Sequence, residues 1–292
     1  DYAGHEQRLQ LGTLENWDRT EELATISVPT LVIGATHDTM DPAWMRMMSE
    51  RLPNGRYLQC SGGHAANIDD ADTYWAGLID FLIPIAKGYV TDRCCDVCNL
   101  GIQVYGGYGY IREYPMEQLL RDCRITPIYE GTNGIQAMDL LGRKLGQNKG
   151  RPIMDLVGEI QTVLTAAKVV ARTAPLAEKV ESAVNRLGEV AMHIGAAAMS
   201  DKVLTAFAHA HPFLDVCGDV AMAWMLLWRA RIAAERLAAG PKEKDALFYE
   251  GQIKSAEFFV YTLLPVTLGK MNAILAAGSA TVDIPEDAFG GK

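Results

Sequence analysis

The sequence has no run of basic residues, and its net charge of −9 is acidic. A protein that binds nucleic acid neutralises phosphates with Lys and Arg, so we predict no nucleic-acid partner. No uninterrupted apolar run reaches the roughly 18 residues expected of a membrane span, and no basic-plus-apolar signal segment opens the chain. We therefore expect no membrane span and a cytoplasmic protein. The chain begins with Asp1 rather than Met, which we interpret as a fragment.

Paired metal-binding cysteine motifs are also absent. Of the six cysteines, Cys94, Cys95 and Cys98 are crowded together, but no second Cys-x-x-Cys pair and no nearby His complete a zinc motif. We predict no metal site and interpret these cysteines as small apolar residues on a helix in a reducing cytoplasm. The Gly-x-Ser-x-Gly elbow that carries a hydrolase nucleophile is missing from all 292 residues as well.

Material for a core is abundant, because 49% of the 292 residues are hydrophobic. In the first 80 residues, short apolar runs alternate with turn signals. They predict a strand at residues 28–34, a loop carrying Asp38, a helix from residue 41 to 51, a strand at 56–60 and a loop carrying His64. An Asp and a His on loops after successive strands can orient and activate a nucleophile, but they cannot replace one.

This order resembles the C-terminal part of an α/β-hydrolase of the proline iminopeptidase group. The motifs that carry the resemblance lie at residues 17–20, 28–34, 37–42 and 63–70. It implies that Asp38 is the triad acid and His64 the triad base, which would be relics here without the serine elbow. Two strands cannot make a stable sheet alone, so we expect an incomplete α/β segment.

From about Phe81 the pattern becomes helical, and the fold class is mainly α. Prolines and glycines delimit four long helices near residues 152–173, 175–208, 212–239 and 243–277. Residues 221–228 are apolar all round, which is typical of a buried helix or an interface. His193, His209 and His211 show no carboxylate partners in their spacing, and we interpret them as helical histidines without a chemical role.

The most informative stretch is Ile-Tyr-Glu-Gly-Thr-Asn-Gly-Ile-Gln at residues 128–136. Pro127 prevents a helix from continuing, and Thr132 or Asn133 can cap a new one. Glu130 therefore projects from a fixed loop between apolar neighbours and a helix N-terminus. Apolar neighbours disfavour the charged carboxylate and the helix end favours it, and such opposed effects suit a general base.

Residues 103–136, with Gln-Val-Tyr-Gly-Gly-Tyr-Gly-Tyr first and Tyr-Glu-Gly-Thr last, closely resemble the C-terminal domain of the FAD-dependent acyl-CoA dehydrogenases. The resemblance implies that Glu130 removes the acyl α-proton while the β-hydride passes to flavin. It further implies that Gln103, Gly106 and Gly107 contact the FAD of a neighbouring subunit. Thr132 would contact the flavin of its own site. Independently of the family, glycines without Cβ let backbone N–H groups approach a phosphate, although a plain turn has the same pattern.

We divide the chain into a hydrolase-like part at 1–80, a partial dehydrogenase C-terminal domain at 81–149 and a helical domain at 150–292. The last resembles the extra C-terminal domain of larger acyl-CoA dehydrogenases, including the methylmercaptopropionyl-CoA dehydrogenase group. The resemblance implies an acyl-CoA substrate, an electron-transfer acceptor such as a flavoprotein, and a homo-oligomer. We expect the isolated chain to be inactive, because the family's N-terminal and middle domains have no counterpart here. A serine hydrolase fragment and a non-catalytic helical assembly module are the alternatives.

Overall fold

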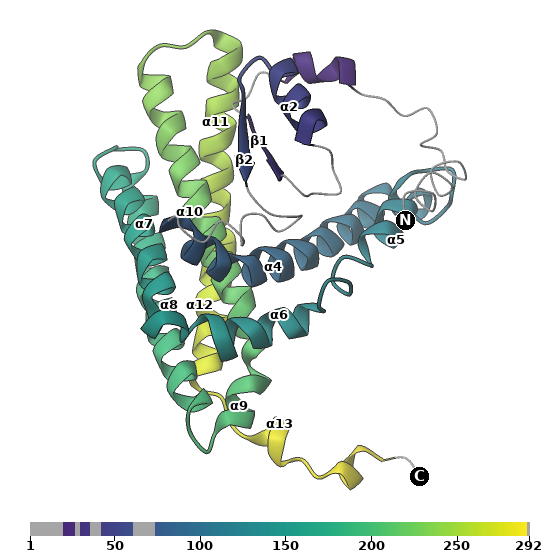
Figure 1. Cartoon of the computed structure of the whole chain (residues 1–292), viewed down its shortest axis with the longest axis vertical. Coiled ribbons are helices and arrows are strands. Elements are labelled where there is room, and N and C mark those ends of the chain that lie inside the picture. Colours follow the sequence, from purple (N-terminus) through teal and green to yellow (C-terminus); the bar gives the residue numbers. More distant parts are fainter. Residues whose placement is uncertain (1–19, 27–29, 36–41, 61–73, 291–292) are drawn as a thin grey trace. The chain divides into compact units, whose positions relative to one another are not determined.

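The computed structural model describes residues 20–26, 30–35, 42–60 and 74–290, and the chain divides into two compact units, Asp1–Ile79 and Asp80–Lys292 (Figure 1). Asp38 and His64 lie outside the described residues. Helix α4 (Tyr74–Tyr105) contains the division between the units. The helical fold class predicted for most of the chain is confirmed.

The first unit contains a short 3-10 turn, η1 (Thr20–Thr25), and a strand–helix–strand unit. Strands β1 (Thr30–Ala35) and β2 (Gly55–Cys60) are parallel, with Thr30 opposite Gly55. Helix α2 (Pro42–Arg51) connects them, as a parallel pair requires. A Cβ on Gly55 would lie 2.0 Å from the Ser49 carbonyl oxygen, so only glycine fits where β2 begins. The predicted order of strand, helix and strand is confirmed for the described residues.

The second unit begins within α4, which is followed by the turn η2 (Gly106–Gly109), α5 (Met116–Cys123) and α6 (Asn133–Asp139). A π-helical turn, η3 (Leu140–Lys144), and a 3-10 turn, η4 (Gln147–Gly150), lead into the longer helices. Lys144 is only 2% exposed, and its ammonium pairs with the Asp80 carboxylate near the start of this unit. A buried charge needs such a partner, so this ion pair joins η3 to α4.

Next come the long helices and the short α9: α7 (Arg151–Lys168), α8 (Ala174–Ala198), α9 (Val203–Ala208), α10 (Ala210–Ala238), α11 (Glu243–Phe258) and α12 (Leu264–Leu275). The π turn η5 (Phe259–Leu263) joins α11 to α12. Helix α10 packs against α6, α7, α8, α11 and α12, so it is the centre of the bundle (Figure 1). On α8, buried residues recur three or four apart, as at Leu176, Val180, Ala183 and Val184, which is the apolar stripe of a packed helix.

Two predictions about these helices need correction. The single helix predicted at 175–208 is broken between α8 and α9, because the Ser200 hydroxyl donates to the Ala197 carbonyl at 2.9 Å and accepts from the Lys202 N–H at 3.1 Å. A serine side chain that takes over backbone hydrogen bonds in this way ends a helix. Of the two alternatives predicted for 221–228, a fully buried helix is wrong and an interface stays open: Trp224 is buried, whereas Met222 and Trp228 are 36% and 41% exposed.

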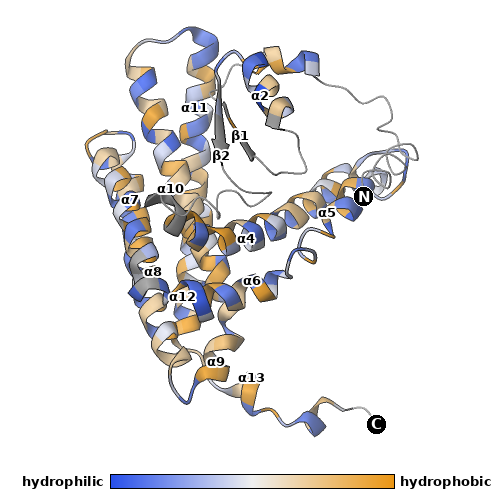
Figure 2. Ribbon diagram, viewed as in Figure 1, coloured by the Kyte–Doolittle hydropathy of each residue, from blue (hydrophilic) through white to orange (hydrophobic). Residues whose placement is uncertain are grey.

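By length and composition alone, one helical stretch of the described chain, Glu243–Leu275, could cross a membrane. Core helices of bundles pass the same test. Its buried residues, which include Ile253, Ala256, Leu264 and Met271, pack it against α8 and α10. Figure 2 shows hydrophilic residues interspersed with hydrophobic ones along α11, as expected for a helix with one face in a bundle.

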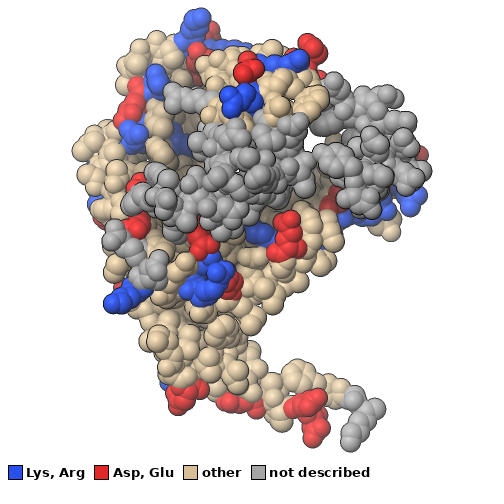
Figure 3. Space-filling model, in the orientation of Figure 1, with Lys and Arg blue, Asp and Glu red and all other residues tan. Residues whose placement is uncertain are grey.

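The chain ends in a segment that contains α13 (Ala280–Asp283) and the turn η6 (Glu286–Phe289). No residue of either element is buried. Figure 3 shows acidic side chains gathered on this segment, which carries Asp283, Glu286 and Asp287.

Candidate functional site

The loop between α5 and α6 holds the predicted base. Glu130 has φ 54° and Gly131 has φ 83°, so two successive residues adopt the left-handed backbone conformation. Only glycine adopts it without cost, and for other residues it costs roughly 1–2 kcal/mol. Such strain persists only where surrounding contacts impose it, and it clusters at functional sites. The backbone of Glu130 is therefore held in place by its neighbours.

Local hydrogen bonds fix both ends of this loop. The Thr132 hydroxyl accepts from the Ile135 N–H at 3.3 Å, so Thr132 is the N-cap of α6, as one of the two predicted capping residues. The Gln136 side-chain amide donates to the Glu130 carbonyl at 3.0 Å, and the Asn133 N–H donates to the Pro127 carbonyl at 3.0 Å. The backbone of Glu130 is thus tied to the first turn of α6.

A longer-range tether connects the loop to α4. The Lys87 ammonium donates to the Gly131 carbonyl at 2.7 Å and to the Asn133 side-chain oxygen at 2.8 Å. Asn133 is 5% exposed, and its amide nitrogen lies 3.0 Å from the Gly88 carbonyl, 2.9 Å from the Thr91 hydroxyl and 2.8 Å from the Asp92 carboxylate. Desolvation lowers the pKa of Lys87, while the charges of Asp92 and Glu130 oppose that shift.

Sequence reasoning missed this tether, and it also missed a partner of Asp92. The His211 Nε2 atom lies 3.0 Å from the second carboxylate oxygen of Asp92, so the prediction that the histidines lack carboxylate partners is wrong for His211. Asp92 therefore connects α10 with the Asn133 side chain. All these contacts join residues more than 40 positions apart, and local spacing carries no signal for them.

The setting of Glu130 differs from the predicted one. Glu130 is exposed, and its apolar neighbours Ile128 and Tyr129 are 56% and 48% exposed. The expectation that the carboxylate lies in a desolvating apolar setting is therefore wrong for this chain, because these apolar side chains are themselves exposed.

The predicted cofactor contacts Gln103, Gly106 and Gly107 lie where α4 ends, and all three are exposed. Gly106 has φ 61°, and a Cβ on either glycine would meet no atom within 4 Å. Three tyrosine rings surround the turn: Tyr114 lies 6.0 Å from Tyr105 and 5.1 Å from Tyr108, measured between centroids. An open glycine backbone beside aromatic rings suits a ligand with phosphates and a flat ring system, so these residues fit a dinucleotide cofactor.

The cysteines form a cluster that the sequence did not predict. The thiols of Cys94, Cys98 and Cys123 form one cluster, and the Cys123 sulfur is 3.6 Å from that of Cys95. Cys94, Cys95 and Cys98 lie on one helix, α4, as predicted, but the sequence did not predict that Cys123 joins them. Cys94 and Cys98 face the same side of α4 because they are one turn apart, whereas the approach of Cys123 depends on tertiary packing.

Comparison with known proteins matches two stretches of this chain to protein families. Residues 57–145 match the model described as acyl-CoA dehydrogenase, C-terminal domain. Residues 156–285 match the model described as acetyl-CoA dehydrogenase C-terminal like. The helical part of this chain therefore consists of acyl-CoA dehydrogenase C-terminal domains.

Individual relatives agree with this assignment. The chain is 34% identical over 222 residues to a butyryl-CoA dehydrogenase of Syntrophomonas wolfei subsp. wolfei, a match that covers 74% of this chain and 35% of that protein. It is 36% identical over 228 residues to a 3-methylmercaptopropionyl-CoA dehydrogenase of Ruegeria pomeroyi, covering 75% of this chain and 37% of that protein. The chain thus spans about a third of the length of these relatives.

A different family matches another part of the chain. A proline iminopeptidase of Flavobacterium johnsoniae is 44% identical over 72 residues, which is 24% of this chain and 24% of that protein. The similarity to proline iminopeptidases predicted for the N-terminal part is confirmed.

Proposed function

We propose that this chain provides the catalytic base of a FAD-dependent acyl-CoA dehydrogenase, with Glu130 removing the α-proton of an acyl-CoA thioester. The observation that carries the proposal is the strained, doubly tethered backbone of Glu130. Its φ of 54° is maintained while Lys87, Asn133 and Gln136 hold the atoms on either side. A catalytic base needs precise positioning, and this loop fixes the backbone from which the Glu130 carboxylate projects.

The chemistry divides between the protein and its cofactor. A bound flavin supplies the hydride acceptor. The carboxylate of Glu130 takes the α-proton, while the exposed surface beside Ile128 and Tyr129 leaves room for the substrate to approach. Thr132 and the turn carrying Gln103, Gly106 and Gly107 are the residues that would hold FAD. The reduced flavin must then be reoxidised by an electron-transfer acceptor such as a flavoprotein, which is the expected partner.

The spacing of these residues supports an oligomer. Lys87, which carries the Glu130 loop, and Gln103 are about 16 residues apart on α4, which is roughly 24 Å along the helix. This separation is compatible with what the family resemblance implies, namely that Thr132 contacts the flavin of its own site and Gly106 the FAD of a neighbouring subunit. Free thiols at all five described cysteines suit a reducing compartment, so we place the enzyme in the cytoplasm.

The test replaces the matched segment of the Syntrophomonas relative with residues 81–292 of this chain and follows flavin bleaching by butyryl-CoA. Glu130→Gln should slow bleaching by about 10²–10⁴-fold, the usual contribution of a positioned base, while flavin absorbance is retained. Glu243→Gln, at an exposed glutamate on α11, is the matched control and should bleach normally. Unchanged bleaching in Glu130→Gln would refute the assignment.

A further inference from the structure

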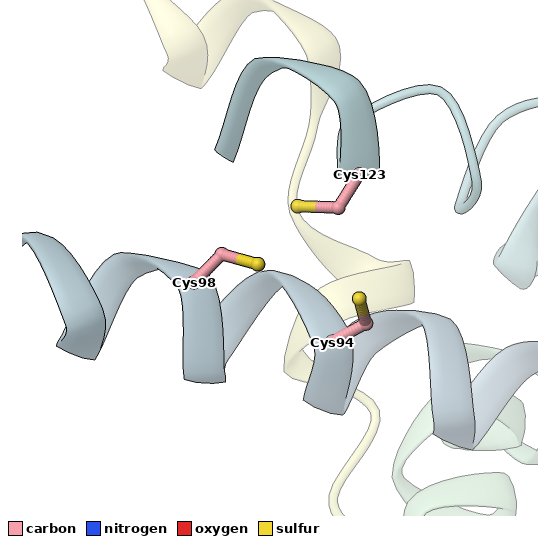
Figure 4. A group of neighbouring side chains, drawn as sticks. All are labelled: Cys94, Cys98 and Cys123. Carbon is pink, nitrogen blue, oxygen red and sulfur yellow. The ribbon is translucent and has the colours of Figure 1, made fainter. Parts of the chain in front are cut away.

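Three thiols converge between α4 and α5. Cys94 and Cys98 project from successive turns of α4, and Cys123 is the last residue of α5. Their sulfur atoms all lie within 4.8 Å of one another, and Figure 4 shows them directed into the space between the two helices. This cluster lies outside the proposed base and cofactor contacts, and neither of those assignments uses it.

The chemistry of the cluster selects a particular kind of ligand. Thiolates bind soft or borderline ions such as zinc, whereas magnesium and calcium prefer oxygen. No carboxylate belongs to this group of side chains. Cys94 is exposed, Cys98 is intermediate and Cys123 is buried, so an ion can enter from the solvent side and reach a thiol anchored in the interior.

The distances suit one ion. Zinc–sulfur bonds of about 2.3 Å place the sulfurs of a tetrahedral site roughly 3.8 Å apart. Thiols already within 4.8 Å of one another need shifts of about 1 Å or less, which rotation of the side chains can supply. We propose that Cys94, Cys98 and Cys123 bind one zinc ion through three thiolates, with the fourth position open to water on the side of Cys94.

Binding is an exchange of protons for metal without any change of oxidation state. Three S–H groups release three protons, and three zinc–sulfur bonds form. Cysteine binds a metal ion as the thiolate, whereas a free thiol, with a pKa of about 8.5, is mostly protonated at neutral pH. Affinity should therefore increase with pH.

Cys95 has a supporting role in this site. Its sulfur lies 3.6 Å from that of Cys123, close enough for its S–H to donate to the metal-bound thiolate. Such second contacts to a ligand typically change metal affinity by about 10–100-fold. The site would join α4 to α5 shortly before the Glu130 loop, but it does not depend on the function proposed for Glu130.

Cobalt(II) substitution tests the proposal on the full chain, since cobalt bound by thiolates shows an intense near-ultraviolet charge-transfer band. We expect one cobalt per chain, displacement by zinc, and a loss of affinity greater than about 100-fold in Cys94→Ser, Cys98→Ser and Cys123→Ser. Cys94→Ser is the decisive variant because its exposed side chain can change without disturbing the core. Cys217→Ala, at a buried cysteine outside the cluster, should bind normally.

A second measurement uses the proton balance and the exposure of Cys94. Zinc should release about three protons per ion and should protect Cys94 from alkylation. No charge-transfer band in the fully reduced wild-type chain would overturn the proposal. A band of unchanged strength in Cys94→Ser, or zinc that leaves Cys94 fully reactive, would do so as well.

Discussion

The Lys87 ammonium lies 2.8 Å from the side-chain oxygen of Asn133, and the two residues are 46 positions apart in the sequence. Glu130 directly precedes the tethered Gly131 carbonyl and the capped start of α6, so these contacts restrain its backbone. The lysine therefore positions the proposed base without touching a substrate. Substitutions at the tether therefore test the stability of the loop, and substitutions of Glu130 itself test its function.

Asn133→Ala should lower the free energy of unfolding by about 2–3 kcal/mol, because Lys87, Asp92 and the Gly88 carbonyl each lose a buried partner. Urea unfolding followed by circular dichroism measures this change. Asn99→Ala, at an exposed position of the same helix α4, is the control and should change stability by less than about 0.5 kcal/mol. Equal losses in the two variants would show that the tether contributes nothing.

Because Glu130 has a left-handed backbone, replacing it with glycine should increase stability while removing the proposed base. Glu130→Gly should stabilise the chain by up to about 1 kcal/mol, because glycine adopts φ 54° without steric cost. Glu130→Ala removes the same carboxylate but keeps the Cβ, so it should show no such gain. Thermal unfolding of both variants makes the comparison. If alanine stabilises the chain as much as glycine, backbone strain is not the cause.

Local sequence patterns predicted most helices and strands well, but they did not predict the helix break at Ser200 or the contacts between helices. The apolar runs at 28–34 and 56–60 became β1 and β2, and Thr132 was predicted as one of two candidate caps and caps α6. The break at Ser200 was missed because it depends on which hydrogen bonds a serine side chain makes. The Lys87–Asn133 contact could not be predicted, since it depends on how α4 and α6 pack.

A buried polar cluster predicts that the folded chain loses stability at alkaline pH. The Asp219 carboxylate accepts from the Tyr89 hydroxyl at 2.8 Å and from the Thr267 hydroxyl at 2.8 Å, and it lies 3.2 Å from the Lys270 ammonium. Desolvation and the Asp219 hydrogen bond raise the pKa of Tyr89 above 10.0. The pKa of Lys270 also lies above 10.5: desolvation lowers it, but the contacts with Asp215 and Asp219 outweigh that effect.

Both groups therefore stay protonated in the folded chain at a pH where the unfolded chain loses those protons. Their stabilising contribution is complete below about pH 10 and decreases as the pH rises further. Urea midpoints measured from pH 8 to pH 11 should fall above pH 10, with a shallower fall in Tyr89→Phe. A midpoint that stays constant to pH 11 would contradict this account of the cluster.

The hydrolase-like segment should show no hydrolase activity. Asp38 and His64 match a triad acid and base, but the sequence has no serine elbow, and without a nucleophile the covalent step cannot occur. The full chain should neither react with a fluorophosphonate probe nor turn over a prolyl amide. Specific labelling that disappears in His64→Ala would instead favour the serine hydrolase alternative.

Hydrogen exchange should distinguish the two units of the chain. In the described part of the first unit, β1 and β2 pair only with each other, and each strand leaves an outer row of backbone groups outside the sheet. A two-stranded sheet is marginal, because it buries too little apolar area to resist opening. Residues 221–228 of α10 lie instead at the centre of the bundle, where opening exposes several helices at once. We therefore expect faster exchange across β1 than across residues 221–228, measured by mass spectrometry on the full chain. Equally slow exchange would show that the strand pair has a core of its own, so that the hydrolase-like segment is a stable domain.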